Sequence, residues 1–287
     1  MDWIRALFLA VLQGITEPFP VSSLGHTVVI PGALGWGDLL NSQAFLPLVV
    51  TLHLGTASAL LIFFWRDWRD IISAFIRVVA RRKVGTDPNE RLSWLIVVGT
   101  IPAGLIGLIL QNPLTSLFSI PELAAVFLVL NGSILFLGEL LRRRAEPKTL
   151  ERQKQEMVFK DLHQLTWKDA LFIGAMQSLA LIPGISRSGV TMVAGLSQGL
   201  SHKAAARFAF LLATPLILAA GVLEVPKLFG NTQALLIAVV GGVVAGLAAY
   251  LSTRFLMRYF ELGRLDPFAF YCWGVGLLAI ILFFWRG

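Results

Sequence analysis

A polar stretch near the start of the chain carries residue types that could do chemistry. Residues 13–26 read Q-G-I-T-E-P-F-P-V-S-S-L-G-H and interrupt an otherwise apolar N-terminus. The stretch combines a carboxylate, hydroxyls and an imidazole, which are groups used in acid–base and nucleophilic catalysis. These residues are Glu17, Ser22, Ser23 and His26.

A second polar stretch, I-P-G-I-S-R-S-G at residues 182–189, adds the complementary charge. Arg187 offers a forked guanidinium that suits phosphate oxygens. Hydroxyls and free N–H groups at helix N-termini could bind further phosphate oxygens. Those hydroxyls belong to Ser22, Ser186, Ser188 and Thr191. The two stretches together predict a phosphate-binding site.

Several roles stay open at such a site. Glu17 could act as general base or help to hold a divalent cation. His26 could be the base, the acid or the nucleophile. Ser23 could be the attacking hydroxyl, activated by Glu17 or by His26. A purely structural interpretation is an ion pair between Glu17 and Arg187, but an ion pair alone would not need the surrounding hydroxyls and imidazole.

The elements that must position these residues are membrane helices. The chain is 56% apolar and 14% charged, with a mean hydropathy of +0.75. Six windows approach or exceed the ~20 residues that a helix needs to cross a bilayer. The net charge of +7 is gathered in a few loops, as topology determinants are, so no nucleic-acid partner is predicted. The windows are residues 44–66, 91–110, 121–142, 203–226, 233–257 and 267–285.

Prolines in the polar stretches predict broken helices. Pro18 and Pro20 cannot continue a helix, and Ser22 is a good N-cap for the next one. We therefore expect a re-entrant helical hairpin at residues 2–37 and another at residues 167–200. Broken helices with polar residues at the break are how membrane proteins build sites at depth.

The second half of the chain repeats the first. Residues 3–13 and 167–177, at a spacing of 164, share five of eleven residues, and a polar break follows each. Three crossings after each hairpin force the halves into opposite orientation. The prediction is an all-α membrane protein of two inverted repeats, with six full spans and ten helical segments. The first repeat is residues 1–144, a cytoplasmic connector is residues 145–166, and the second repeat is residues 167–287.

Loop charges predict the orientation. The basic run at residues 66–83 and the arginines at 142–144 should be cytoplasmic, whereas residues 111–122 form a turn-rich outer loop without a basic residue. Both termini are then external. The two hairpins enter from opposite leaflets, and their polar breaks meet near the midplane.

Other ionisable residues carry less weight. His53, in mid-span, is interpreted as a hydrogen-bonded core residue. His163 and His202 are interpreted as solvated loop residues, and Glu139 and Glu224 as carboxylates at span ends.

The motifs E-P-F-P-V-S-S-L-G-H and P-G-I-S-R-S-G together resemble the bacterial undecaprenyl-diphosphate phosphatase family, linked to bacitracin resistance. The resemblance covers essentially the whole chain. It implies removal of one phosphate from a C55 isoprenoid diphosphate, at the outer face of the bacterial inner membrane, which recycles the carrier for cell-wall synthesis. By position, Glu17, Ser23, His26 and Arg187 match residues held to be catalytic or phosphate-binding. The resemblance also implies a divalent cation, magnesium or calcium.

Three positions depart from the family's pattern. Gln13 stands where an acidic residue is usual, so the pair of carboxylates that it would form with Glu17 is lost and cation binding is weakened. Leu24 replaces a hydroxyl residue, and Arg207 stands where relatives often carry Glu.

A transporter or flippase of polyprenyl phosphate is the alternative function, because opposed hairpins meeting at the midplane are also a layout for alternating access. The expected partners are a polyprenyl diphosphate and membrane lipids, and a homodimer stays open.

Overall fold

The computed structural model describes residues 2–145, 159–261 and 263–286, and every long element within these ranges is a helix. Six helices have the length and apolar composition to cross a membrane, so the chain is a multi-pass membrane protein. The predicted all-α class is confirmed, and the division into inverted repeats stays a prediction. The six are α4 (Phe45–Phe63), α6 (Pro88–Ile109), α8 (Pro121–Ala145), α12 (His202–Glu224), α13 (Thr232–Tyr259) and α14 (Asp266–Arg286).

Four shorter helices occupy the places expected for the hairpins. They are α1 (Trp3–Thr16), α2 (Ser23–Ala33), α10 (Trp167–Gln177) and α11 (Arg187–Ser197). The second helix of each pair begins at the same kind of cap. Ser22 Oγ accepts a hydrogen bond from the Gly25 N–H at 3.1 Å, and Ser186 Oγ accepts one from the Gly189 N–H at 3.1 Å. Each serine thereby satisfies a backbone donor that the first helical turn leaves free.

The backbone at the two breaks is unusual. Gly184 has φ +104°, and a Cβ there would collide with Phe127 Cβ, at 2.6 Å, so only glycine fits. Ser22 is not a glycine but has φ +67°. Such conformations cost about 1–3 kcal/mol and gather at functional sites. The strain therefore lies next to Ser23.

Two segments differ from the sequence-based expectation. The prediction of a turn-rich loop at residues 111–122 is wrong: α7 (Gln111–Ser116) and the 3₁₀ helix η1 (Leu117–Ser119) form there. Pro113 is tolerated because it falls in the first turn, where no N–H is needed. The basic run forms the helix α5 (Trp65–Arg81), which buries an apolar stripe against α6.

The remaining short elements connect the longer ones. They are α3 (Gly37–Leu40), η2 (Leu162–Gln164), η3 (Ser178–Leu181) and η4 (Val225–Leu228). Of the predicted connector 145–166, residues 146–158 lie outside the described residues.

Helices of the two halves pack on each other. In the helix pairs that pack most extensively, α1 lies on α13 and α10 on α6, while α4 contacts both α12 and α13, and α8 contacts α14. Glycines allow two of these crossings: a Cβ on Gly55 would collide with the Gly242 carbonyl oxygen, and one on Gly174 with that of Gly99. Small residues let membrane helices approach closely. The second of these crossings holds the hairpin helix α10 against the spanning helix α6.

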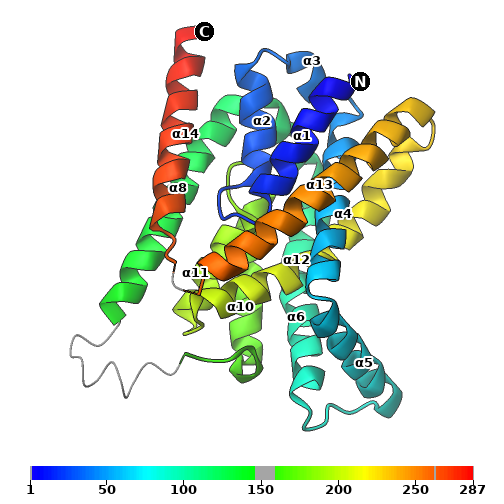
Figure 1. Ribbon diagram of the computed structural model, residues 1–287, viewed down its shortest axis with the longest axis vertical. Coiled ribbons are helices and arrows are strands. Elements are labelled where there is room, and N and C mark those ends of the chain that lie inside the picture. Colours follow the sequence, from blue (N-terminus) through cyan, green and yellow to red (C-terminus); the bar gives the residue numbers. More distant parts are fainter. Residues whose placement is uncertain (1, 146–158, 262, 287) are drawn as a thin grey trace.

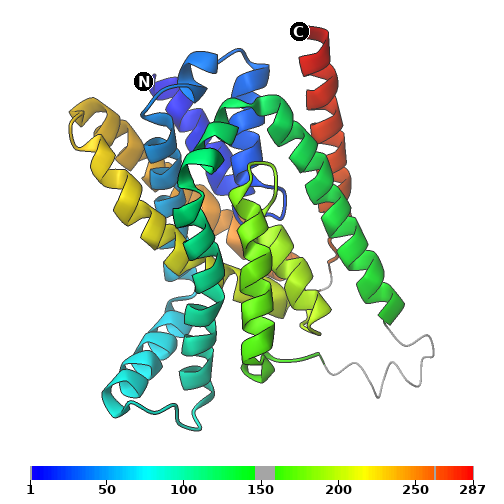
Figure 2. The ribbon, with the colours of Figure 1, turned by 180° about the vertical axis from the view of Figure 1, so that it is seen from behind.

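The arrangement in space places the breaks at mid-height. Both termini lie at one end of the molecule and α5 lies at the other (Figure 1). The pair α1 and α2 lies toward the end with the termini, and α10 and α11 lie toward the opposite end. Figure 2 shows α8 and α14 side by side at one edge.

Candidate active site

The carboxylate of Glu17 is the centre of the site. Glu17 caps the C-terminus of α1 and is buried. Its Oε1 accepts a hydrogen bond from Arg187 Nη2, and its Oε2 accepts one from Ser23 Oγ. Gln13 Nε2 also donates to Oε2, at 2.9 Å, and His53 Nε2 lies 3.1 Å from the same oxygen. One carboxylate therefore joins four donors from four helices, α1, α2, α4 and α11.

Arg187 brings the second hairpin to this carboxylate. It is the first residue of α11, so the break of that hairpin aims its side chain at the break of the first. Its Nη2 contacts Glu17, while Nη1 donates to the Ala213 carbonyl of α12 at 3.2 Å. The expected meeting of Glu17 and Arg187 is thus present in the structure. The contact is an ion pair of two nearly buried groups.

The hydroxyls differ in what they can still bind. Ser22 Oγ donates to the Ile185 carbonyl at 3.2 Å, and Ser188 Oγ donates to the Phe19 carbonyl at 3.0 Å. Thr191 Oγ1 donates to the carbonyl of Arg187 at 2.6 Å. These three hydroxyls tie the two breaks together or stay within their own helix. Ser23 alone among the serines and threonines proposed for the site has its hydroxyl on an ionisable side chain.

His26 is turned away from Glu17. Its Nδ1 donates to the Ser22 carbonyl at 2.7 Å, since a carbonyl oxygen can only accept. Its Nε2 lies 3.0 Å from the Tyr271 hydroxyl, and the two rings stack with centroids 5.6 Å apart. His26 is not among the residues that line the cavity described next. The catalytic role expected for His26 stays a prediction.

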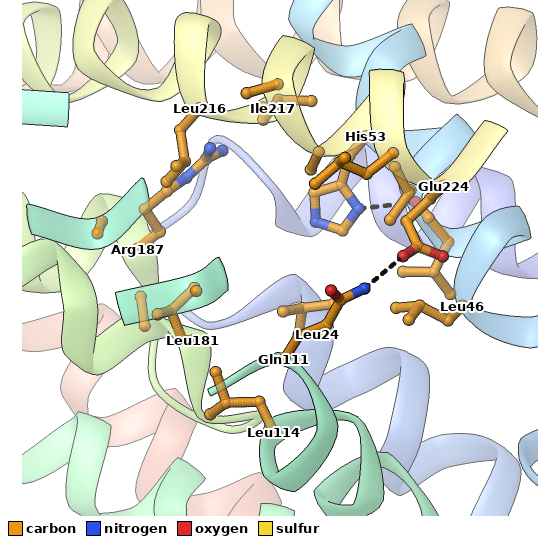
Figure 3. A pocket seen from close by; sticks show the side chains of 18 of the residues that line it. Leu24, Leu46, His53, Gln111, Leu114, Leu181, Arg187, Leu216, Ile217 and Glu224 are labelled. Carbon is orange, nitrogen blue, oxygen red and sulfur yellow. Dashed lines mark hydrogen bonds between the residues drawn. The ribbon is translucent and has the colours of Figure 1, made fainter. Parts of the chain in front are cut away.

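A cavity of about 580 Å³ opens beside Glu17, Ser23 and Arg187. Its walls are mostly apolar, with leucines from several helices (Figure 3). A cavity of this size is typical of a site for a small organic ligand. At its other polar end, Gln111 Nε2 donates to Glu224 Oε1 at 3.0 Å, and Lys227 Nζ donates to the same oxygen at 2.6 Å. The site thus joins a polar corner, formed by Glu17, Ser23 and Arg187, to an apolar chamber. The leucines in the walls of the cavity are Leu24, Leu46, Leu108, Leu114, Leu181, Leu216 and Leu223.

The residues around Glu17 do not fit a resident divalent cation. Such an ion needs about six oxygen ligands. Both oxygens of Glu17 already accept hydrogen bonds, and the Arg187 guanidinium beside them would repel a cation. Within the described ranges no three His, Cys, Asp or Glu side chains gather as a metal site. One feature favours a ligand here: Gln13 Oε1 is buried without a partner.

Sequence reasoning missed three residues that line the cavity. His53 was expected in the core, yet its ring contacts Glu17. Glu224 ends the spanning helix α12, as expected for a span end, but it is only 5% exposed and faces the cavity with Gln111. The spacing from Val49 to His53 is one helical turn, but no sequence pattern says which helix face meets Glu17.

Outside the cavity, His202 and Glu139 depart from expectation, and Arg207 has an acidic partner. His202 is not a solvated loop residue: it begins α12, and its Nε2 lies 2.7 Å from Oε2 of the fully buried Glu139. Arg207 pairs with Asp67 of α5 through Nη2 at 2.5 Å and Nε at 3.1 Å. This pair gives Arg207 a structural role at the contact of α5 with α12.

A family model and the similar proteins of known sequence agree on one family. A family model described as "Bacitracin resistance protein BacA" matches residues 6–278. A protein of Mycolicibacterium paratuberculosis named undecaprenyl-diphosphatase is 47% identical over 300 residues, covering 98% of this chain and 97% of that protein. Undecaprenyl-diphosphatase 2 of Chromobacterium violaceum is 48% identical over 289 residues, covering 98% and 99%. The undecaprenyl-diphosphatase of Granulibacter bethesdensis is 48% identical over 286 residues, covering 98% and 96%.

Proposed function

The chain belongs to the bacitracin resistance protein BacA family, and from this premise we propose that it hydrolyses undecaprenyl diphosphate to undecaprenyl phosphate and inorganic phosphate. The full-length relatives named undecaprenyl-diphosphatase support this reaction. The observation that carries the proposal is the contact of Glu17 with Arg187 and Ser23 at the wall of an apolar cavity. A diphosphate on an isoprenoid chain needs both a cationic corner and an apolar chamber.

The geometry favours Ser23 as the nucleophile. Ser23 Oγ attacks the terminal phosphorus while its proton passes to Glu17 Oε2, and the bond from that phosphorus to the bridging oxygen breaks. Undecaprenyl phosphate leaves with the bridging oxygen. Water then attacks the phosphoserine, and inorganic phosphate and the free hydroxyl are formed. The proton taken by Glu17 is released with the products.

Arg187 couples substrate binding to this chemistry. Without substrate its guanidinium contacts Glu17, which keeps that carboxylate a weak base. The terminal phosphate competes for the same forked donor. Once Arg187 turns to the phosphate, Glu17 loses a positive partner and becomes a stronger base for the Ser23 proton.

Arg187→Ala tests the proposal. We expect phosphate release from farnesyl or undecaprenyl diphosphate to fall by roughly 10²–10³-fold, as when a donor to a developing charge is removed. The measurement is phosphate release by protein purified in detergent, with and without chelator. Arg207→Ala is the matched control, because it removes an arginine–aspartate pair at the α5–α12 contact and leaves the cavity intact. Equal rates for Arg187→Ala and the unsubstituted chain would contradict the proposed site.

We further propose the orientation and setting of the chain. Both termini face outward, the cavity opens to the outer face of the bacterial inner membrane, and the halves are inverted repeats. Basic residues on and around α5, at the end opposite the termini, support this orientation (Figure 1). A homodimer stays a prediction from the sequence.

Transport of a polyprenyl phosphate is the alternative that the sequence raised. It would use the same cavity, and vesicles reconstituted with the protein distinguish the two functions. Movement of a labelled polyprenyl phosphate across the bilayer without phosphate release would favour transport.

A further inference from the structure

The imidazole that contacts the carboxylate of the site belongs to His53 of α4. Its Nδ1 lies 2.8 Å from the Val49 carbonyl, one helical turn earlier, and its Nε2 lies 3.1 Å from Glu17 Oε2. A carbonyl oxygen and a carboxylate oxygen only accept hydrogen bonds, so each ring nitrogen faces an acceptor, and the tautomer with the proton on Nε2 donates to Glu17. The side chain also lines the cavity, as Figure 3 shows.

The two histidines near the site have opposite surroundings. His26 follows Ser23 closely in the chain, yet its ring is held by the Ser22 carbonyl and the Tyr271 hydroxyl. His53 is distant in sequence, yet its ring points at Glu17. The structure therefore places His53 where an imidazole can act on the carboxylate.

When Arg187 turns to the phosphate, the proposed reaction requires another residue that contacts the carboxylate of Glu17. Glu17 then keeps Gln13 and His53 as donors on Oε2. Gln13 lies on α1, four residues before Glu17, so it moves with that helix end. His53 belongs to a spanning helix and ties the tip of the first hairpin to the bundle.

We infer that His53 is a positioning residue, which holds Glu17 in line with the Ser23 hydroxyl during proton transfer. The inference rests on the proposed function. It assigns to the Nε2–H of His53 the task of fixing the carboxylate, and it does not require contact between His53 and the reacting phosphorus.

Two substitutions test the inference. His53→Phe keeps a ring of similar size and removes the N–H donor, so Glu17 is no longer fixed from α4. We expect kcat for phosphate release to fall by about 10- to 100-fold, because small misplacement of a catalytic group has effects of that order. KM should change by less than about threefold, since the interaction lost acts on the chemical step. His53→Gln, which retains an N–H donor, should recover most of kcat.

Controls separate this inference from the proposed function and from misfolding. Ser58→Ala, on an exposed face of α4, should leave kcat and KM unchanged. Melting temperatures in detergent identify any variant that does not fold. If His53→Phe does not fold, His53→Gln and the shorter amide variant His53→Asn are compared with the unsubstituted chain instead. Unchanged kcat in His53→Phe would overturn the inference while leaving the proposed function intact. So would equal losses in the folded Phe and Gln variants, or a rise in KM alone. No phosphate release from the unsubstituted chain would instead contradict the proposed function.

Discussion

At the scale of single residues, the carboxylate of Glu17 is held from four places in the chain. Gln13 approaches from the same helix, Ser23 from the start of the next, His53 from α4 and Arg187 from the second hairpin. Taking a charge out of water is costly unless it is paired and hydrogen-bonded. These donors meet that cost, and they leave no free carboxylate oxygen for a metal ion.

We therefore expect the melting temperature of the unsubstituted protein to be the same in excess chelator as in magnesium. A resident cation at 100 times its Kd would stabilise the fold by about 2.7 kcal/mol, which a thermal unfolding measurement in detergent detects readily. Gln13→Glu is the matched variant, because it places a second carboxylate beside Glu17. Its melting temperature should rise with magnesium. A rise of similar size in the unsubstituted protein would contradict the donor argument.

At the scale of elements, the site depends on helices that cross very closely. The hairpin helix α1 packs on α13, which in turn crosses α4, the helix that carries His53. The crossing of α4 and α13 has glycine on both sides, at Gly55 and Gly242. Because the interiors of membrane proteins are close-packed, a single added methyl group at such a point must push the helices apart.

Gly55→Ala should lower stability and activity together. The added Cβ would collide with the Gly242 carbonyl oxygen, and overpacking of this kind costs about 1–3 kcal/mol. Gly274→Ala in α14 is the matched control, since a Cβ there has no neighbouring atom within 4 Å. Thermal unfolding and phosphate release would be measured for both. An unchanged melting temperature in Gly55→Ala would show that the crossing can relax.

At the scale of the whole molecule, two halves with similar breaks form one cavity. The caps at Ser22 and Ser186 fall at the same spacing of 164 as the repeated segments. Each hairpin also packs its first helix on the other half, α1 on α13 and α10 on α6. The positions are equivalent but the residue types differ: in the alignment at a spacing of 164, Arg187 aligns with Ser23 and Leu181 aligns with Glu17. The asymmetry gives one carboxylate and one guanidinium to a single shared site.

Labelling of single cysteines tests the proposed orientation. Ser119→Cys and Lys83→Cys each place a thiol at an exposed position, and the natural Cys272 is buried. Ser119 is in η1, which contacts α3 at the end with the termini, and Lys83 follows α5 at the other end. A membrane-impermeant maleimide applied to intact cells should label Ser119→Cys, and should label Lys83→Cys only after permeabilisation. The reverse pattern would place the termini in the cytoplasm.

The sequence predicted the all-α class, the six spanning helices and the helix starts at Ser22 and Ser186 closely. These features are local: apolar length, proline and a capping serine determine them within a few residues. It failed for residues 111–122 and did not foresee the helix α5, although Ile71, Ala74 and Val78 recur at helical spacing along the basic run. Only the tertiary structure shows that α6 is the helix that covers them.

The sequence by itself determined which residue types stand at the two breaks, and hence predicted Glu17 and Arg187 as the charged residues of one site. Only the tertiary structure decided which neighbours join them. His53 reaches Glu17 while His26 turns to Tyr271, and Ser23 rather than Ser22 contacts the carboxylate. The reason is that side-chain contacts between distant segments depend on how helices rotate and cross, and a partial rotation of one helix about its axis would exchange these partners without changing any local pattern.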